Sequence, residues 1–186
     1  IKSDDTIKLI CVSIERKYHG YKKLIKGLKK YYDENGQRNI EIDFVGVYSK
    51  KTKNLVKKLN LDDKIHFLGK KYGDELIKLY NNADLGVGAF GFRGGTEYGS
   101  SIKTKEYFAL GIPFINGWKE YSFDDSYPYV KRFDLNCDYI DFNEVVKFYE
   151  SIKDDDQMKY KMRKFAEDHF TWEAQFTKIF NEINKS

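Results

Sequence analysis

Short apolar runs alternate with amphipathic stretches along the first two thirds of the chain. The runs are too continuously apolar to have one solvated face, which is typical of strands buried on both faces of a parallel sheet. We predict strands at Ile7–Ile14, Ile40–Val47, Lys64–Gly69, Asp84–Ala89 and Pro113–Ile115.

The stretches between these runs have the period of a helix. Tyr21, Leu24, Ile25 and Leu28 recur at i, i+3, i+4 and i+7, which places them on one helix face, and Asn35-Gly36 ends that helix. Further helices are predicted at 50–59, from Gly73-Asp74 through Tyr80, and at 102–110, which Gly111 ends.

Strands that alternate with helices predict an α/β fold, a Rossmann-like parallel sheet flanked by helices with right-handed crossovers. The pattern weakens after Asn116, where we predict a last strand at 129–133 and C-terminal helices at 143–152, 155–169 and 172–183. No repeat and no linker divides the sequence, so residues 1–186 are predicted to form one domain, with C-terminal helices at about 143–183.

Composition excludes several classes of protein. Aromatic residues make up 17% of the 186 residues, which argues against disorder, and no apolar run reaches the roughly 18 residues of a membrane span. Lys and Arg exceed Asp and Glu by 33 to 29, and most lysines fall in helical patterns, which favours solvated helix faces. The sequence lacks the dense basic stripe of a nucleic-acid groove, and an anionic ligand or membrane surface is the alternative that stays open.

The ends and the cysteines of the chain add three expectations. Cys11 and Cys137 have neither metal-site spacing nor a disulfide framework, and Cys11 is expected to be a buried thiol. The N-terminus has no signal-peptide apolar region and no initiator Met. We therefore expect a cytoplasmic domain cut from a longer chain.

The richest candidate for chemistry is the glycine-rich segment Gly88–Ser101. It follows a predicted strand, where ligands of open parallel sheets bind, and it leads into the helix at 102–110. A helix N-terminus offers free N–H groups and a positive dipole to an anion, and Ser100 or Ser101 is expected to cap it. Lys103 lies in the first turn of this helix, where the dipole disfavours a cation. Its position makes sense if it faces a phosphate.

Two further groups of residues lie close enough for joint action. Glu106 is one turn after Lys103, so both are expected to face the same site, where the carboxylate suits two vicinal hydroxyls; the alternative is a surface ion pair. Arg16, Lys17 and His19 follow the first strand beside a helix start, which matches half of a phosphate or sugar clamp; the alternative is an ordinary surface histidine.

Together these segments resemble a known family. Cys11–Ile14 followed by His19–Leu28 resembles the first strand and helix of bacterial GT4-type glycosyltransferases, and Ile42–Gly46 and Ile65–Gly69 resemble their next two strands. Ser100–Ile115, SSIKTKEYFALGIPFI, is similar to their "SxLKxxEYxAxGxPfi" signature.

The resemblance implies the C-terminal, donor-binding half of a GT-B enzyme, with the N-terminal, acceptor-binding half absent. Such enzymes are retaining and metal-independent, use UDP- or GDP-sugars, and need no other cofactor. The implied partners are a nucleotide sugar, the protein's own acceptor domain, and a saccharide or lipid-linked acceptor, with at most peripheral membrane contact. Many members build surface polysaccharide, which implies a location in the cytoplasm or at the inner face of the membrane.

Position by position, the resemblance assigns nucleotide contacts around one signature. Glu106 matches the glutamate that binds the ribose hydroxyls, Lys103 the lysine near the diphosphate, and Ser101 and Ile102 offer backbone N–H groups to phosphate. Gly69 lies near the position of the base.

The remaining site residues that the resemblance implies come from the first loop and from two positions where this sequence departs from the family's motifs. His19 and Gly20 match the first loop, and His19 is a catalytic candidate. The first glutamate of the family's E-x7-E motif falls on Tyr98, which leaves the adjacent Glu97 as the second catalytic candidate. The usual arginine after the first strand is missing, so Arg16, Lys17 or Arg93 is expected to supply the cation.

Two other functions remain open at this level. A GT-B sugar-nucleotide epimerase shares the fold without the signature, and a non-catalytic nucleotide-binding or interaction module derived from the fold would tolerate Tyr98. A flavodoxin-like module fits less well, because Arg16-Lys17 has the wrong charge for a flavin phosphate loop or an acidic pocket.

Overall fold

A computed structural model describes residues 6–184, apart from the side chains of residues 178 and 182, and its centre is one six-stranded parallel sheet. The strands are β1 (Thr6–Ile14), β2 (Asn39–Val47), β3 (Ile65–Gly69), β4 (Leu85–Val87), β6 (Phe114–Asn116) and β8 (Val130–Arg132). Their order is β3-β2-β1-β4-β6-β8, so the topology reverses between β1 and β4. The predicted Rossmann-like fold class is confirmed. Residues 1–5, on which the expectation about the N-terminus rests, lie outside the described residues.

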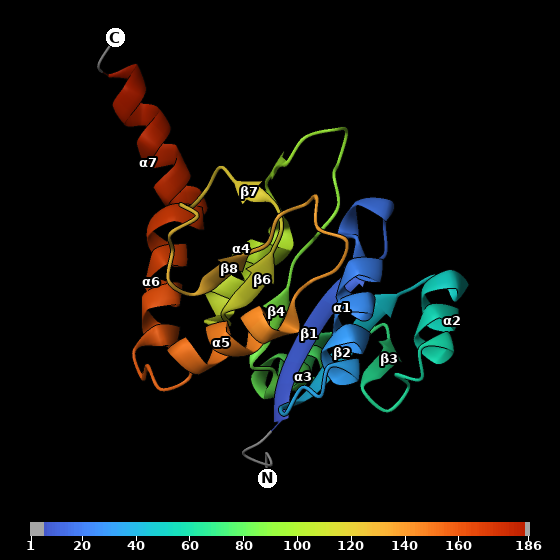
Figure 1. Cartoon of the computed structure of the whole chain (residues 1–186). Coiled ribbons are helices and arrows are strands. Elements are labelled where there is room, and N and C mark those ends of the chain that lie inside the picture. The colour runs from blue at the N-terminus through green and yellow to red at the C-terminus, as the bar shows by residue number, and fades with distance from the viewer. Residues whose placement is uncertain (1–5, 185–186) are drawn as a thin grey trace.

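Helices cover both faces of this sheet (Figure 1). They are α1 (Tyr21–Asp33), α2 (Lys50–Lys58), α3 (Gly73–Asn82), α4 (Ile102–Leu110), α5 (Phe142–Ile152), α6 (Met158–Phe170) and α7 (Trp172–Ile183), with a 3₁₀ turn, η1, at Lys17–His19. Right-handed crossovers place α1 and α2 on one face and α3 and α4 on the other. α1 packs against α2 and α5, α4 packs against α6, and α7 extends away from the body.

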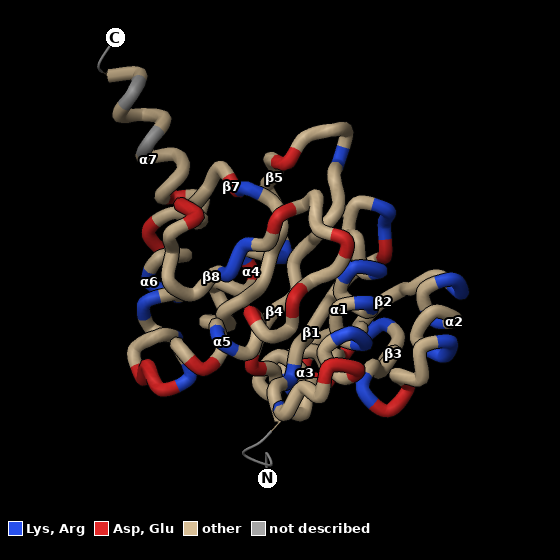
Figure 2. The backbone as a smooth tube through the Cα atoms, viewed as in Figure 1, with Lys and Arg blue, Asp and Glu red and all other residues tan. Residues whose placement is uncertain are grey.

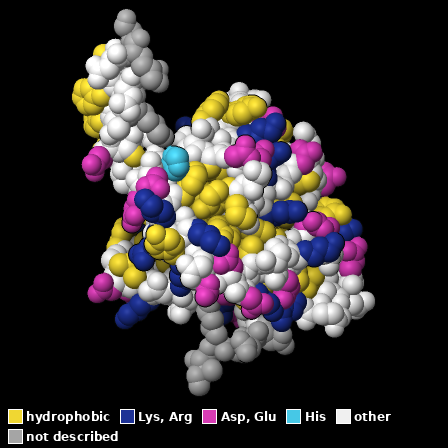
Figure 3. Space-filling model, turned by 90° about the vertical axis from the view of Figure 1, so that its left-hand side faces the viewer, with side chains coloured by type: hydrophobic (Ala, Val, Ile, Leu, Met, Phe, Trp, Pro, Cys, Tyr) yellow, Lys and Arg dark blue, Asp and Glu magenta, His cyan; other side chains and the backbone are white. Residues whose placement is uncertain are grey.

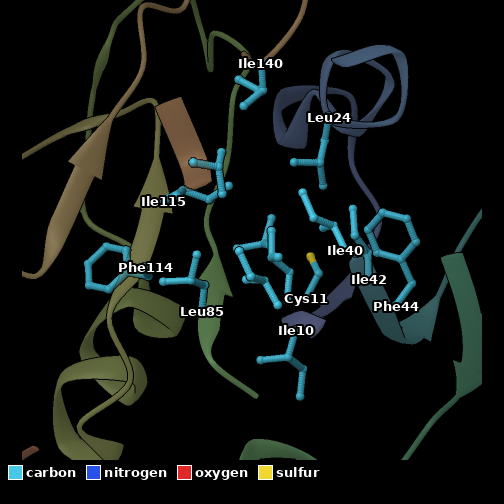
Figure 4. Close-up of a cluster of buried hydrophobic side chains, with 14 of the residues drawn as sticks. Ile10, Cys11, Leu24, Ile40, Ile42, Phe44, Leu85, Phe114, Ile115 and Ile140 are labelled. Carbon is cyan, nitrogen blue, oxygen red and sulfur yellow. The ribbon is translucent and has the colours of Figure 1, made fainter. Parts of the chain in front are cut away.

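The core forms where the apolar strands meet the periodic helix faces (Figure 4). All four residues of the predicted face of α1, Tyr21, Leu24, Ile25 and Leu28, are buried. Cys11 is fully buried in β1, as expected, and both cysteines are free thiols.

Two features differ from the sequence-based prediction. The helix predicted from Asp155 begins at Met158, because Asp155 forms the turn before it: its carboxylate accepts a bond from Gln157 N–H and its carbonyl one from Met158 N–H. A two-stranded ribbon, β5 (Tyr98–Gly99) with β7 (Lys119–Glu120), was not predicted. Strands of two residues leave no periodic signal.

Candidate active site

A cavity of about 300 Å³ lies at the carboxyl ends of β1 and β4, where the strand order reverses. In open α/β sheets this is the position where ligands bind. The end of β1, η1, the loop after β4, the start of α4 and one tryptophan line it: Val12, Ser13, Ile14, Tyr18, His19, Ala89, Arg93, Ser100, Ser101, Ile102, Lys103 and Trp118. Five of the predicted site residues therefore share one cavity: His19, Arg93, Ser101, Ile102 and Lys103.

The backbone of η1 is fastened to the loop after β4. Phe90 N–H donates to the carbonyl of His19 at 2.9 Å, and Gly91 N–H donates to that of Tyr18 at 3.0 Å. Gly20 has φ +64°, and a Cβ there would lie 2.7 Å from the carbonyl carbon of Phe90. Gly20 therefore allows the close approach that positions His19, and it does not itself line this cavity.

His19 is a neutral hydrogen-bond donor in this cavity. Its Nδ1 accepts a bond from Arg16 N–H at 3.1 Å, and its ring stacks on Tyr21. Burial, with the charges of Lys103 and Arg16, lowers the pKa of His19 to about 3. A neutral imidazole whose Nδ1 is an acceptor carries its proton on Nε2, so His19 offers an Nε2–H bond rather than a charge.

Lys103 points inward from the first turn of α4. Its Nζ donates to the hydroxyl of Tyr21 and to the carbonyl of Gly88, both at 3.1 Å, and lies 4.0 Å from the sulfur of Cys11. Burial lowers the pKa of Lys103. Lys103 thus lines the cavity, but its N–H donors are already bonded within the protein. Its ammonium would therefore attract a bound anion by its charge and not by a direct hydrogen bond.

Arg93 supplies an exposed cation at the same cavity. Its guanidinium lies 5.2 Å from the ring of Tyr18, in a cation–π arrangement. Together with the N-terminus of α4 and the Nε2–H of His19, it makes the cavity suited to an anion with several oxygen acceptors.

Glu106 is not brought into this cavity. It lines a neighbouring cavity of about 650 Å³ between α4 and α6. Burial raises the pKa of Glu106, and the charge of Lys103 opposes that rise. The described residues contain no ion pair between Glu106 and Lys103, so the surface pair considered as an alternative is not formed.

Glu97 is held in the β5–β7 region rather than in the cavity. Its carboxylate lies 2.6 Å from Lys119 Nζ, and its carbonyl accepts a bond from Lys119 N–H. The ion pair raises the pKa of Lys119. Glu97, which directly precedes β5 and Tyr98, is therefore bonded to Lys119 and does not line the cavity.

Glu120 is the residue of this region that sequence reasoning missed. Its side chain is fully buried and lies at the N-terminus of α4, 3.3 Å from Ser101 N, 2.9 Å from the hydroxyl of Thr104 and 2.7 Å from Lys105 Nζ. The expected serine cap is wrong: Ser101 holds the N-cap position, but its hydroxyl makes no capping bond. A carboxylate 19 residues away replaces it.

The remaining predicted residues lie apart from this cavity. Arg16, Lys17 and Gly20 line a larger cavity between α1 and α2. Gly69 ends β3 with φ +69° and open space where a Cβ would be.

Comparisons with known proteins show the family and the fold. A family model described as "Glycosyl transferases group 1" matches residues 1–116, which is more than half of the chain. The chain belongs to this glycosyltransferase family. No curated protein matches this chain.

Solved structures show the same fold at low identity. A glycosyltransferase from Rickettsia africae is 18% identical, with a TM-score of 0.73, over 98% of this chain and 49% of its own. The lipopolysaccharide outer core galactosyltransferase WaaB is 13% identical, with a TM-score of 0.72, over 100% of this chain and 51% of its own.

A third structure was solved with ligands. The pneumococcal O-GlcNAc transferase GtfA, in complex with UDP and GlcNAc, is 14% identical, with a TM-score of 0.62, over 97% of this chain and 36% of its own. The glycosyltransferase chain therefore spans about half the length, or less, of these structures, and its fold is that of one Rossmann-like half of a GT-B enzyme.

Proposed function

We propose that this chain is the donor-binding, C-terminal half of a GT4-type hexosyltransferase that is retaining and metal-independent. The observation that carries the proposal is the cavity between η1 and the N-terminus of α4, which combines the Nε2–H of His19, the guanidinium of Arg93 and the buried ammonium of Lys103. These groups suit the diphosphate of a UDP- or GDP-sugar. The complex of the pneumococcal transferase with UDP supports the same ligand class here.

The chemistry follows from where charge develops. When the bond between the anomeric carbon and the diphosphate breaks, negative charge grows on the diphosphate oxygens. Donors fixed in advance at that position stabilise the leaving group most, since they need no reorganisation during the reaction. We assign this role to Arg93, His19 and the N–H group of Ile102. The N–H group of Ser101 already donates to the carboxylate of Glu120, so Ser101 lines the cavity without offering a free donor.

Glu106 remains our candidate for the ribose hydroxyls. It lies one helical turn beyond the diphosphate position, which is the direction in which a bound nucleotide would continue along α4. Burial raises the pKa of Glu106, and its carboxylate forms no ion pair with Lys103. Perturbed pKa values of this kind are common in functional sites.

A second half of the protein would complete the site. Two of the solved structures are about twice as long as this chain. In addition, α7 carries an uncovered apolar stripe (Figure 3) formed by Trp172, Phe176, Ile179, Phe180 and Ile183. Trp172 is 80% exposed and Phe180 60%. We propose that this stripe packs on the acceptor-binding domain of the same protein, and that the 186 residues alone transfer no sugar.

The wider setting belongs to the same proposal. The likeness to a lipopolysaccharide galactosyltransferase supports surface polysaccharide synthesis, with a saccharide or lipid-linked acceptor. Such work would place the enzyme in the cytoplasm or at the inner face of the membrane. The described residues contain no helix long and apolar enough to cross a membrane.

A non-catalytic nucleotide-binding module is the second candidate. Tyr98 occupies the position of the first motif glutamate, and the adjacent Glu97 is paired with Lys119. Sugar transfer by the full-length protein separates the two candidates, because the module would bind the nucleotide and transfer nothing.

Calorimetric titration of UDP, GDP, ADP and CDP, each with EDTA, tests the donor site. We expect one of them to bind without metal and Arg93→Gln to weaken that diphosphate about tenfold, by loss of one charge-assisted contact. Lys147→Gln, which removes an exposed cation on α5, is the matched control and should bind as wild type does. Absence of binding at millimolar concentration, or binding that EDTA abolishes, would contradict the proposal.

A further inference from the structure

A cavity larger than the donor site lies beside it. It has a volume of about 810 Å³ and lies between the N-terminal end of α1, the carboxyl ends of β1 and β2, and α2. This volume is within the range of ligand-binding cavities, about 300–1,000 Å³. The two cavities meet at Ile14, which lines both. On either side of it, Tyr18 and His19 line the donor site while Arg16 and Lys17 line this one.

The floor of this cavity is apolar and open to solvent. Ile14 and Val47, at the ends of neighbouring strands, are 56% and 44% exposed, and Leu55 lies beside them on α2. The rings of Tyr21 and Tyr48 close its inner end. Aliphatic side chains exposed at the bottom of a hollow favour an apolar ligand group.

Five cations line this cavity together with the apolar side chains: Arg16, Lys17, Lys22, Lys51 and Lys58. Within residues 6–184 none of them is ion-paired with a carboxylate. Figure 2 shows Lys and Arg positions gathered along α2.

One carboxylate lines the same cavity, and it is already engaged. Glu15 accepts bonds from Ser49 N–H at 2.7 Å and from the hydroxyl of Thr52 at 2.5 Å, and so holds the N-terminus of α2. The cavity therefore has unpaired positive charge above an apolar floor.

We propose that this cavity binds the headgroup of an anionic phospholipid at a membrane surface. The phosphate lies among Lys51, Lys58 and Arg16, and the first acyl carbons contact Ile14 and Val47. A membrane lipid fits better than an acidic peptide, because α2 carries three further exposed cations, Lys50, Lys53 and Lys57. A flat anionic bilayer attracts all of these cations together. The proposal does not depend on the donor site.

Vesicle sedimentation of the whole chain tests this site. We expect binding to phosphatidylcholine vesicles that contain about one-third phosphatidylglycerol, and little binding to pure phosphatidylcholine. The double variant Lys51→Glu/Lys58→Glu should lower the partition coefficient at least about tenfold. The control Lys147→Glu/Lys153→Glu changes the net charge equally, on α5 and at its C-cap, and should remain within about twofold of wild type. Equal losses in both variants would overturn the site, because net charge alone would then account for binding.

Two further arms distinguish this cavity from a simple phosphate site and from membrane contact through α7. Val47→Ser, an exposed position that leaves the core intact, should weaken vesicle binding and leave binding of glycerol 3-phosphate unchanged. Soluble dihexanoyl-phosphatidylglycerol should bind at least about tenfold more tightly than glycerol 3-phosphate, since its acyl carbons reach the floor. Vesicle binding lost in Trp172→Ser/Phe180→Ser but kept in Lys51→Glu/Lys58→Glu would assign the membrane contact to α7 and refute the proposal.

Discussion

Replacing Glu120 by glutamine should loosen the N-terminus of α4. The wild-type carboxylate is fully buried and lies within hydrogen-bond distance of Ser101 N, the Thr104 hydroxyl and Lys105 Nζ. Glutamine keeps the shape but loses the charge, and its amide NH₂ faces groups that are themselves donors. The turn that presents the N–H of Ile102 to the proposed diphosphate therefore loses the acceptor that holds Ser101, Thr104 and Lys105 together.

The expected cost is set by the strongest of these contacts. Hydrogen bonds to a charged group are worth about 1.5–3 kcal/mol, and the pair at 2.7 Å with Lys105 is the shortest of the set. The bond from Ser101 N is long, at 3.3 Å to both oxygens, and adds less. We expect Glu120→Gln to lower stability by about 2–3 kcal/mol. For a domain of this size that corresponds to a fall in Tm of about 4–12 °C.

Thermal and urea unfolding of Glu120→Gln, Lys105→Met and the double variant would measure this directly. The double-mutant cycle should give a coupling energy of about 1–2 kcal/mol between the two side chains. Glu144→Gln, which breaks solvent-accessible ion pairs with Lys131 of β8 and Lys147 of α5, is the control and should change the midpoint little. A loss under about 0.5 kcal/mol for Glu120→Gln, with no coupling, would refute the role assigned to this carboxylate.

Three other perturbations probe the site and its support. Gly20→Ala should lower stability by about 3 kcal/mol or more in urea unfolding, because its Cβ meets the backbone of Phe90, whereas Gly94→Ala, also at positive φ but in open space, should cost about 1 kcal/mol. The pKa of His19 is about 3 in the folded protein and about 6.5 in the unfolded chain, so the unfolded chain gains a proton between pH 7 and 5 and the folded protein does not. The free energy of unfolding of wild type should therefore fall by roughly 1–2 kcal/mol more than that of His19→Asn over this range. Equal losses in the two proteins would place His19 in water. Glu106→Gln should weaken nucleosides and nucleoside diphosphates alike by about ten- to a hundredfold in calorimetry; an unchanged affinity would remove Glu106 from the site.

Local periodicity was sufficient to predict most of the fold. The apolar runs of β1 and β2 and the four-residue face of α1 are buried where the pattern places them. In α4 the hydropathy is inverted: Ile102 is 80% exposed and Lys103 is buried. Which face of α4 turns inward depends on the two groups that accept hydrogen bonds from Lys103, the hydroxyl of Tyr21 and the carbonyl of Gly88. Both belong to other parts of the chain, so no local sequence pattern encodes them.

The candidate site was predicted in part for the same reason. The glycine-rich loop and the helix after it are continuous in sequence, so Arg93, Ser101, Ile102 and Lys103 could be grouped in advance. The tautomer of His19 depends on its contact with Arg16 N–H and on burial, which only the fold provides. Glu120 comes from a stretch with little periodicity, and its partners on α4 are set by the ribbon that brings β7 beside β5.

The most direct measurement is a two-dimensional ¹⁵N–¹H NMR titration of the chain with UDP in EDTA, because it reports both binding and location. The proposed donor site predicts shifts concentrated at Tyr18–Gly20, Arg93 and Ser100–Lys103, with weaker changes extending along α4 toward Glu106. Shifts confined to the cavity between α1 and α2, or none at millimolar UDP or GDP, would contradict the assignment of the donor site.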